Sequence, residues 1–340
     1  MKLNNKLIYF LLGFLILLLF FLINISLGSV SISFSDTFKS LIGQNIENQS
    51  NAYIIKNYRL PKALTAILTG SGLAISGLMM QTLFRNPLAG PYVLGLSSGA
   101  SLGVALVIMG GVLFGFSSLV FSSWNIIIAA SLGSFLVMLA VIAASFRMKN
   151  TMGILIIGIM FAALTGAIVN ILSYFSPSDQ LQKYVFWSFG SLGNLSTEEL
   201  SILFLCWIIG LILCLFSLKS LNALLLGENY AKSMGIQLKK NRFLVIISTC
   251  ILAGSITAFA GPIAFVGLAV PHLIRLIIPT SNHLVLMPAV LISGAILMLI
   301  CDTIAQLPGS ELTLPINAVT SIFGAPIVIW LILRKRKLVF

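Results

Sequence analysis

The sequence predicts an all-α protein that crosses a membrane about ten times. Hydrophobic residues make up 59% of the 340 residues and charged residues only 8%, whereas soluble domains carry about 25% charged residues. Apolar runs of about 20 residues recur, and a helix of that length spans the ~30 Å hydrocarbon core of a bilayer. So few charges cannot cover a soluble surface, so we expect lipid to cover most of this chain.

Short breaks with Gly, Pro, Asn and basic residues divide the chain into ten expected spans, all within one transmembrane domain, residues 1–340. The spans are Leu7–Leu27, Ala63–Phe84, Tyr92–Phe114, Leu119–Phe146, Thr151–Phe175, Leu200–Leu218, Phe243–Ala260, Ile263–Ile278, Leu284–Ile304 and Pro315–Leu333. The first is longer than a signal-peptide core, so we expect an uncleaved helix. The eighth is short and contains Gly267 and Pro271, so we expect a broken or partial helix.

The basic residues predict the orientation of the chain. With the N-terminus in the cytoplasm, 15 of the 20 Lys and Arg residues fall on the inner side and seven of the eight acids on the outer side. This bias follows the positive-inside rule and places both termini in the cytoplasm. The net charge of +12 is therefore a topology signal, and without an aromatic-interleaved basic patch it does not indicate nucleic acid as a partner.

An internal echo suggests a repeat. Ala89-Gly90-Pro91 follows the second span and Ala260-Gly261-Pro262 follows the seventh, on opposite faces of the membrane. Such an arrangement favours an inverted repeat of spans two to five and seven to ten, as in many transporters. The second span also carries closely spaced small residues between Gly70 and Gly77, which are typical of a helix packed inside a bundle.

Several ordered motifs resemble one family. They are R-L-P-K from Arg59, F-R-N-P-L-A-G-P from Phe84, G-P-I from Gly261, and the ending L-P-I-N-A-V-T-S-I-F-G-A-P from Leu314. Together they resemble the permease subunit of ATP-binding cassette importers for iron chelates, haem and vitamin B12. The resemblance implies ten helices with an inverted repeat, in the bacterial cytoplasmic membrane. It also implies three partners besides lipid: ATPase subunits, an extracytoplasmic substrate-binding protein, and a second permease that is a copy or a homologue.

The sequence contains no catalytic constellation. It has two histidines, His272 and His283, and no phosphate-binding GxxxxGK[ST] loop. The four cysteines lie in apolar runs without metal-ligand spacing, so packing is their expected role. We therefore expect no enzyme activity, cofactor or metal site, and a separate chain must hydrolyse any ATP that drives transport.

The longest inner loop, residues 219–242, is expected to couple the permease to that ATPase. Leu226, Tyr230 and Met234 recur at i, i+4 and i+8, which predicts a short amphipathic helix suited to a groove of a partner. The run from Gly227 to Gly235 resembles the coupling-helix motif of the family. The expected coupling residues are Gly227, Glu228, Tyr230, Ala231, Met234 and Gly235. The alternative is an interfacial helix that lies on lipid.

On the outer side, Lys56, Arg59 and Lys62 cluster before the second span. In the family, basic residues here pair with acids of the binding protein, and such pairs steer association and fix orientation. Simple membrane anchoring is the alternative. Many relatives also have an arginine after the ninth span, where this chain has Gln306.

Four residues match positions at the cytoplasmic narrowing of the family's pathway: Asn86, Leu88, Thr151 and Met152. Asn86 precedes Pro87, so a purely turn-forming role is the alternative. Met152 departs from the small polar residue that the resemblance implies.

Three further polar residues lie in or near spans. His272 and Arg275 are i, i+3 near the inner end of the eighth span, where they could line a cavity or contact the coupling loop. The alternative is a structural pair that bonds loop carbonyls. Asp302 lies near the outer end of the ninth span, and we expect it to cap the helix or bond the next loop.

Rival functions are weaker. An ion-coupled secondary transporter would need ionisable residues at mid-membrane, and the spans offer none at that depth. A membrane enzyme would need a His/Asp/Glu cluster. Among cargoes, a ferric siderophore is the first expectation, then haem, then a corrinoid.

Overall fold

The computed structural model describes residues 3–44, 46, 48–110, 122–148, 151–310 and 312–333, and the regular elements in these ranges are all helices. Seven helices are long and apolar enough to cross a membrane: α1 (Leu3–Ser26), α4 (Leu60–Phe84), α7 (Ser123–Arg147), α8 (Thr151–Phe175), α10 (Thr197–Leu224), α12 (Leu238–Ala260) and α14 (His283–Ala305). Three shorter apolar helices are α5 (Leu96–Ile108), α13 (Val266–Ile277) and α15 (Ile316–Leu333). These ten segments coincide with the ten predicted spans, although three are too short to count as full spans.

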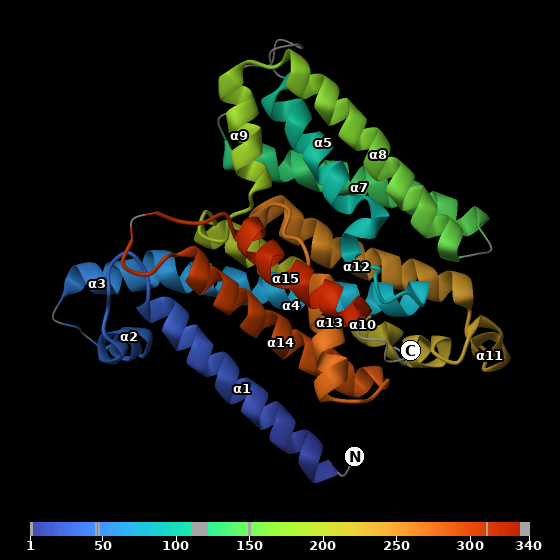
Figure 1. Cartoon of the computed structure of the whole chain (residues 1–340), viewed down its shortest axis with the longest axis horizontal. Coiled ribbons are helices and arrows are strands. Elements are labelled where there is room, and N and C mark those ends of the chain that lie inside the picture. Colours follow the sequence, from blue (N-terminus) through green and yellow to red (C-terminus); the bar gives the residue numbers. More distant parts are fainter. Residues whose placement is uncertain are drawn as a thin grey trace.

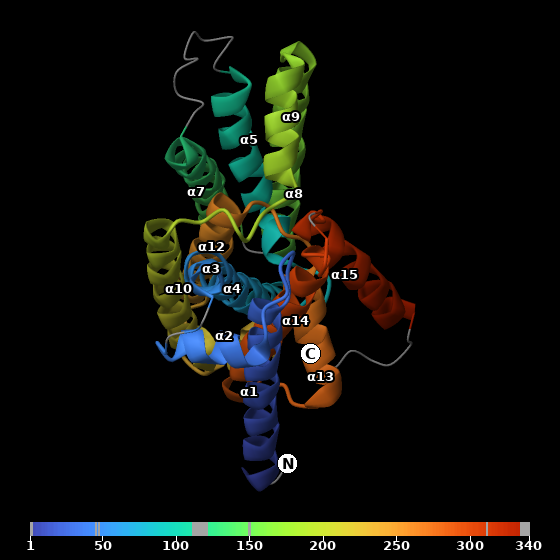
Figure 2. The same cartoon turned by 90° about the vertical axis from the view of Figure 1, so that its left-hand side faces the viewer.

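The remaining elements are short. They are α2 (Phe34–Leu41), α3 (Gln49–Ile54), the π-helical turn η1 (Ile55–Arg59), the 3₁₀ turn η2 (Pro91–Leu94), α9 (Ser178–Ser188) and α11 (Glu228–Ser233). Helices α2 and α3 lie at the left-hand end of the molecule in Figure 1, and α11 lies at the opposite end. Figure 2 shows α2 and α3 in front of α4, which enters the middle of the bundle behind them.

Helix α4 is the core of the bundle. Nearly every side chain from Ala63 to Phe84 is buried, including serines and threonines that donate to carbonyls of the preceding turn. Such back-bonding satisfies hydroxyl groups that have no water to bond in a membrane.

The packing pattern contains an inverted repeat. Helix α4 packs against α14, and its counterpart α12 packs against α7, so each repeat's first helix contacts the third helix of the other repeat. The short second helix of each repeat packs on the third and fourth helices of its own repeat: α5 packs on α7 and α8, and α13 packs on α14 and α15. The exchange interlocks the two halves into one body, as the sequence echo predicts.

Glycine permits the closest of these contacts. A Cβ on Gly77 of α4 would lie 1.6 Å from the carbonyl oxygen of Gly267 in α13. No side chain fits there, so the two backbones meet directly. Small residues at helix crossings provide the van der Waals contact that drives association in lipid.

The structure corrects two expectations. The third span is not one helix from Tyr92, because η2 is followed by a left-handed Gly95 (φ 79°) before α5 begins, and residues 111–114 lie outside the described part. The inner loop is shorter than the expected residues 219–242, because α10 continues to Leu224 and α12 begins at Leu238. The eighth span is a partial helix of 12 residues with Pro271 inside it, as expected.

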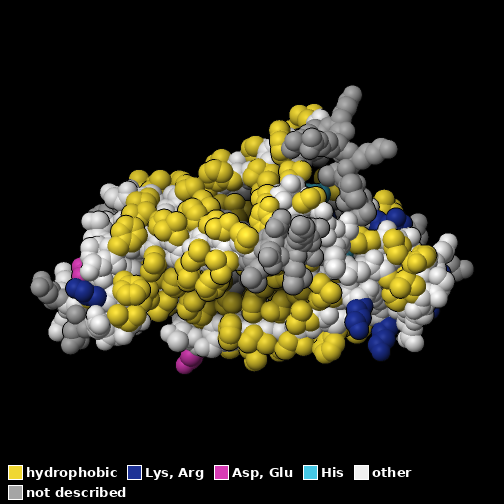
Figure 3. All heavy atoms as spheres, turned by 90° about the horizontal axis from the view of Figure 1, so that it is seen from below, with side chains coloured by type: hydrophobic (Ala, Val, Ile, Leu, Met, Phe, Trp, Pro, Cys, Tyr) yellow, Lys and Arg dark blue, Asp and Glu magenta, His cyan; other side chains and the backbone are white. Residues whose placement is uncertain are grey.

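The surface is that of a membrane protein. Figure 3 shows hydrophobic side chains over the middle of one face and charged side chains mainly towards its two ends. Large exposed apolar side chains occur along α1, α7, α8 and α10. Since water would disfavour such a belt, lipid must cover it.

Candidate functional sites at the two ends of the bundle

At one end of the bundle, the loop between α10 and α12 presents a short helix. Gly227 (φ 109°) precedes α11 and Gly235 (φ 81°) follows it, and these backbone angles favour glycine. Leu226, Tyr230 and Met234 are exposed, whereas Ala231 between them is fully buried. The helix therefore turns its small residue towards the bundle and an apolar face outward.

One arginine connects this helix to two other segments. Arg242 of α12 forms an ion pair with Glu228 of α11, with 2.7 Å between Nη2 and Oε1. It also donates from Nη1 to the carbonyl oxygen of Met148, 3.4 Å away, between α7 and α8. Sequence reasoning placed Glu228 in the coupling group but missed Arg242, whose spacing from Glu228 gave no signal.

The loop after α4 is tied down from two sides. Asn86 Oδ1 accepts a 2.9 Å bond from the Leu88 amide, which closes a local turn. His272 donates from Nε2 to the Pro87 carbonyl oxygen over 2.6 Å. Leu88 remains exposed beside this fixed turn.

Arg275 and Gln81 extend the same connection inside the bundle. Arg275 Nη1 donates to Gln81 Oε1 at 2.8 Å, and Gln81 Nε2 donates to the Leu268 carbonyl oxygen at 3.2 Å. Helix α13 is thus bonded to α4 and to the loop after it.

A second polar link, which sequence reasoning missed, joins three helices. His283 at the start of α14 lies 2.8 Å from Thr82 Oγ1 of α4, and its Nδ1 donates to Asn222 Oδ1 of α10 over 2.7 Å. Asn222 is near the end of α10, and α11 begins at Glu228, so this link lies close to α11 in the chain.

The fifth span begins at the same end. Helix α8 starts at Thr151, whose side chain lies outside the described part, and Met152 is half exposed. A Cβ on Gly158 would lie 2.5 Å from the Val93 carbonyl oxygen of η2, so the segment after Leu88 packs directly on α8. The two predicted gate pairs are therefore on neighbouring segments.

At the opposite end, Arg59 is only 8% exposed. Its guanidinium donates to the carbonyl oxygens of Ile25 and Ser26, each 2.8 Å away, and to that of Val30. Ile25 and Ser26 are the last residues of α1, where unsatisfied carbonyls attract a cation. Arg59 therefore holds the end of α1 against η1.

Lys62 is also engaged. Its Nζ lies 3.1 Å from Oδ1 of Asp302, which is 2% exposed. Asn24 and Gln306 donate to the other oxygen, Oδ2, at 2.9 and 2.7 Å. Gln306 thus donates a hydrogen bond to the same carboxylate that pairs with Lys62. Lys56, the third basic residue of the cluster, is exposed on η1.

These outer residues border a cavity of about 710 Å³. Its walls come from the end of α1, η1, α4, the α9–α10 loop and the segment after α14, including Tyr58, Arg59, Lys62, Asp302 and Gln306.

Within the described ranges, no group of three or more His, Cys, Asp or Glu residues could hold a metal ion. The four cysteines are unpaired, and three of them are buried.

An inverted repeat of apolar helices is an architecture that many membrane transporters share. The chain belongs to the FecCD transport family, which matches residues 16–334, and it is thus a permease subunit of the ATP-binding cassette importer type.

Named relatives match over most of the chain. The hemin transport system permease protein of Yersinia pestis is 36% identical over 329 residues, covering 96% of each chain. The vitamin B12 import system permease protein of Klebsiella pneumoniae is 38% identical over 285 residues, covering 82% of each.

Solved structures show the same fold. A metal-chelate type ABC transporter in an inward-facing conformation aligns with a TM-score of 0.83 and 31% identity, covering 96% of this chain and 98% of the other. PsaBC from Streptococcus pneumoniae, solved with a Fab, aligns at a TM-score of 0.56 and 15% identity, covering 88% of this chain and 95% of that one, which supports the fold alone.

Proposed function

We propose that this chain is the membrane pathway of an importer for a metal chelate, powered by ATPase subunits that dock on α11. The full-length match to chelate permeases carries this proposal. The apolar face around α11 supports the docking role, since Leu226, Tyr230 and Met234 are each more than half exposed. An apolar helix face of this kind fits a groove of a partner.

Movement of α11 has a route into the permease. Arg242 joins Glu228 to the carbonyl of Met148, three residues before Thr151. We propose that ATPase closure moves α11, and that Arg242 carries this movement to the α7–α8 turn. Asn86, Leu88, Thr151 and Met152 form the gate in this proposal, with His272 and Arg275 holding the Asn86 turn in place.

The pathway itself lies between two permeases. The exposed face of α8 combines apolar residues with Gly166 and Asn170, and α15, its counterpart in the repeat, also has an exposed face. A polar amide on a lipid-facing surface is unfavourable, whereas it suits a water-containing pathway. We propose that α8 and α15 face a second permease, either a copy or a homologue.

The binding protein docks at the other end. Lys56 is the exposed member of its cluster, and we propose that it pairs with an acid of the binding protein. Arg59 and Lys62 support that surface by fixing α1, η1 and α14 below it. In this proposal α11 is inside and Lys56 outside, so both termini lie in the cytoplasm, and the positive-inside bias of the sequence supports this orientation.

The cargo is a ferric siderophore, haem or a corrinoid. The named relatives are assigned to hemin and vitamin B12, and the similar solved structure to a metal chelate. We propose a ferric siderophore as the first cargo to test, with the other two as direct competitors. Uptake of each labelled chelate by the assembled importer distinguishes the three.

The docking proposal is tested by co-purification of the ATPase from detergent. We expect Tyr230→Asp and Met234→Asp to abolish co-purification, because each places a charge on the face that must become buried. Lys219→Gln, in the last turns of α10 and outside this face, is the control. Retention of the ATPase by both aspartate variants would contradict docking on α11.

A further inference from the structure

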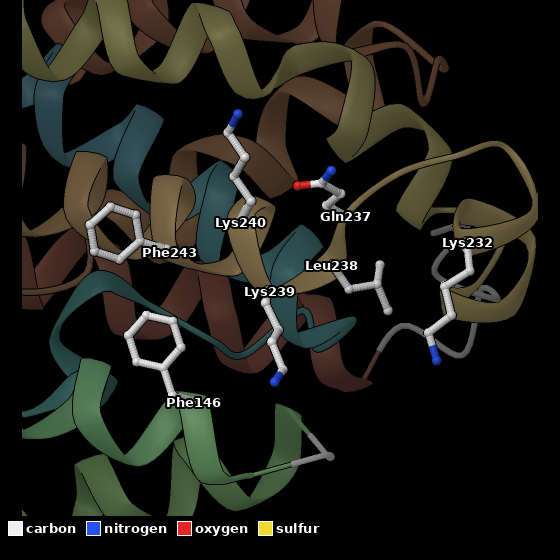
Figure 4. A pocket seen from close by; sticks show the side chains of 7 residues that line it. All are labelled: Phe146, Lys232, Gln237, Leu238, Lys239, Lys240 and Phe243. Carbon is white, nitrogen blue, oxygen red and sulfur yellow. The ribbon is translucent and has the colours of Figure 1, made fainter.

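A basic hollow of about 620 Å³ opens where α7, α11 and α12 meet. We define it by its lining residues: Phe146, Lys232, Gln237, Leu238, Lys239, Lys240 and Phe243. In Figure 4, Lys232 and Lys239 extend towards the same side of the hollow, while Lys240 points the other way.

The hollow has an aromatic wall and, one helical turn away from it, a lysine ammonium group. Phe146 and Phe243 stack with 6.3 Å between ring centroids and form its apolar wall. Lys239 precedes Phe243 by four residues on α12, about 6 Å closer to water at ~1.5 Å per residue. An ammonium group one turn above an aromatic wall matches the change from headgroup to hydrocarbon in a bilayer.

The positive charge of the hollow is not neutralised within the described part of the chain. The two ion pairs found there are Lys62–Asp302 and Arg242–Glu228, and neither involves a lysine of the hollow. Glu228, the acid of the α11 segment, is committed to Arg242. Lys232, Lys239 and Lys240 are all exposed.

The apolar wall continues onto the membrane surface. Ile128, Leu132, Leu136 and Leu139 are exposed at helical spacing along α7, and the same helix ends with the exposed Phe146. This stripe forms a track from the hollow into the hydrocarbon layer. A soluble anion would use the lysines alone, whereas a lipid would use both the lysines and the track.

We infer that the basic hollow binds an anionic phospholipid, with its phosphate at Lys232 and Lys239 and an acyl chain along Phe146, Phe243 and the exposed stripe of α7. Basic pockets between membrane helices are suited to such headgroups. Because Lys232 belongs to α11 and Lys239 to α12, one bound lipid bridges the two helices. The binding claim needs only a membrane and not the proposed ATPase docking.

The test is native mass spectrometry of the full-length permease, titrated with phosphatidylglycerol or phosphatidylcholine. We expect stronger retention of phosphatidylglycerol, and an affinity about fivefold weaker for each of Lys232→Gln and Lys239→Gln. Arg147→Gln and Lys219→Gln remove exposed charges from the same end without lining the hollow, and should leave retention unchanged.

Phe146→Ser tests the acyl-chain contact, because it should weaken retention without any change in charge. Equal retention of both lipids, or equal loss in the control variants, would overturn the proposal. Full competition by glycerol 3-phosphate alone would also overturn it, since the hollow would then recognise a free phosphate. None of these outcomes depends on whether the ATPase docks on α11.

Discussion

At the scale of single residues, buried cations connect segments that are far apart in the chain. Arg242 joins α12 to α11 and to the carbonyl of Met148, and Arg59 joins η1 to the end of α1. In a membrane bundle a guanidinium can satisfy several carbonyls that water cannot reach. These contacts fix the ends of the helices relative to one another.

We predict that Arg242→Gln and Glu228→Gln each lower stability by about 1 kcal/mol, a modest value because the Glu228 side chain is 32% exposed. Both should reduce ATP hydrolysis stimulated by the binding protein. The loss of stability in the double variant should be smaller than the sum of the losses in the two single variants, because both single variants remove the same contact. Denaturant unfolding in detergent and ATPase assays measure this, and strictly additive effects would contradict a shared contact.

The sequence predicted some of these roles and missed others. Spacing placed Leu226, Tyr230 and Met234 on one helical face, and they are exposed together. By contrast, the R-L-P-K motif does not reveal that Arg59 is buried. Its burial depends on contact with the end of α1, which lies 33 residues earlier in the chain. The His283–Asn222 and Arg242–Met148 contacts are also long-range, so local pattern could not reveal them.

At the scale of elements, close backbone contact determines which helices can move separately. Gly77 and Gly267 bring α4 and α13 together where no side chain fits. The two helices should therefore move as one unit, and His272 and Arg275 add polar bonds to the same pair.

We predict that Gly77→Ala prevents correct assembly, because its Cβ would overlap the Gly267 carbonyl oxygen. Gly166→Ala is the control, since a Cβ there meets nothing within 4 Å. The yield of monodisperse permease in size-exclusion chromatography measures the effect. A normal yield for Gly77→Ala would contradict the close packing of α4 on α13.

Helix existence was predictable from apolar length, and helix breaks were less so. The third span is continuous in hydropathy, but Gly95 takes a left-handed angle that interrupts it, and α9 is too polar to resemble a span. Pro271 did mark α13 as short, because a proline and a glycine there are visible in sequence.

At the scale of the whole molecule, the inverted repeat places matching ends on opposite sides of the membrane. The proposed orientation puts Lys232 inside and Lys56 outside. We predict that Lys56→Cys reacts with a membrane-impermeant maleimide in intact cells, and that Lys232→Cys reacts only after the membrane is opened. A Cys206→Ser background removes the one native cysteine that is not buried. The reverse labelling pattern would contradict the proposed orientation and show that Lys232 lies outside and Lys56 inside.

In the proposed function, ATP hydrolysed by a docked partner drives a chelate through this permease. Uptake of labelled ferric siderophore, hemin and vitamin B12 into proteoliposomes containing permease, ATPase and binding protein tests it most directly. We predict uptake of at least one cargo with ATP, none with an ion gradient alone, and loss of uptake in Tyr230→Asp. Uptake driven by an ion gradient without ATP would contradict the account and make the protein a secondary transporter.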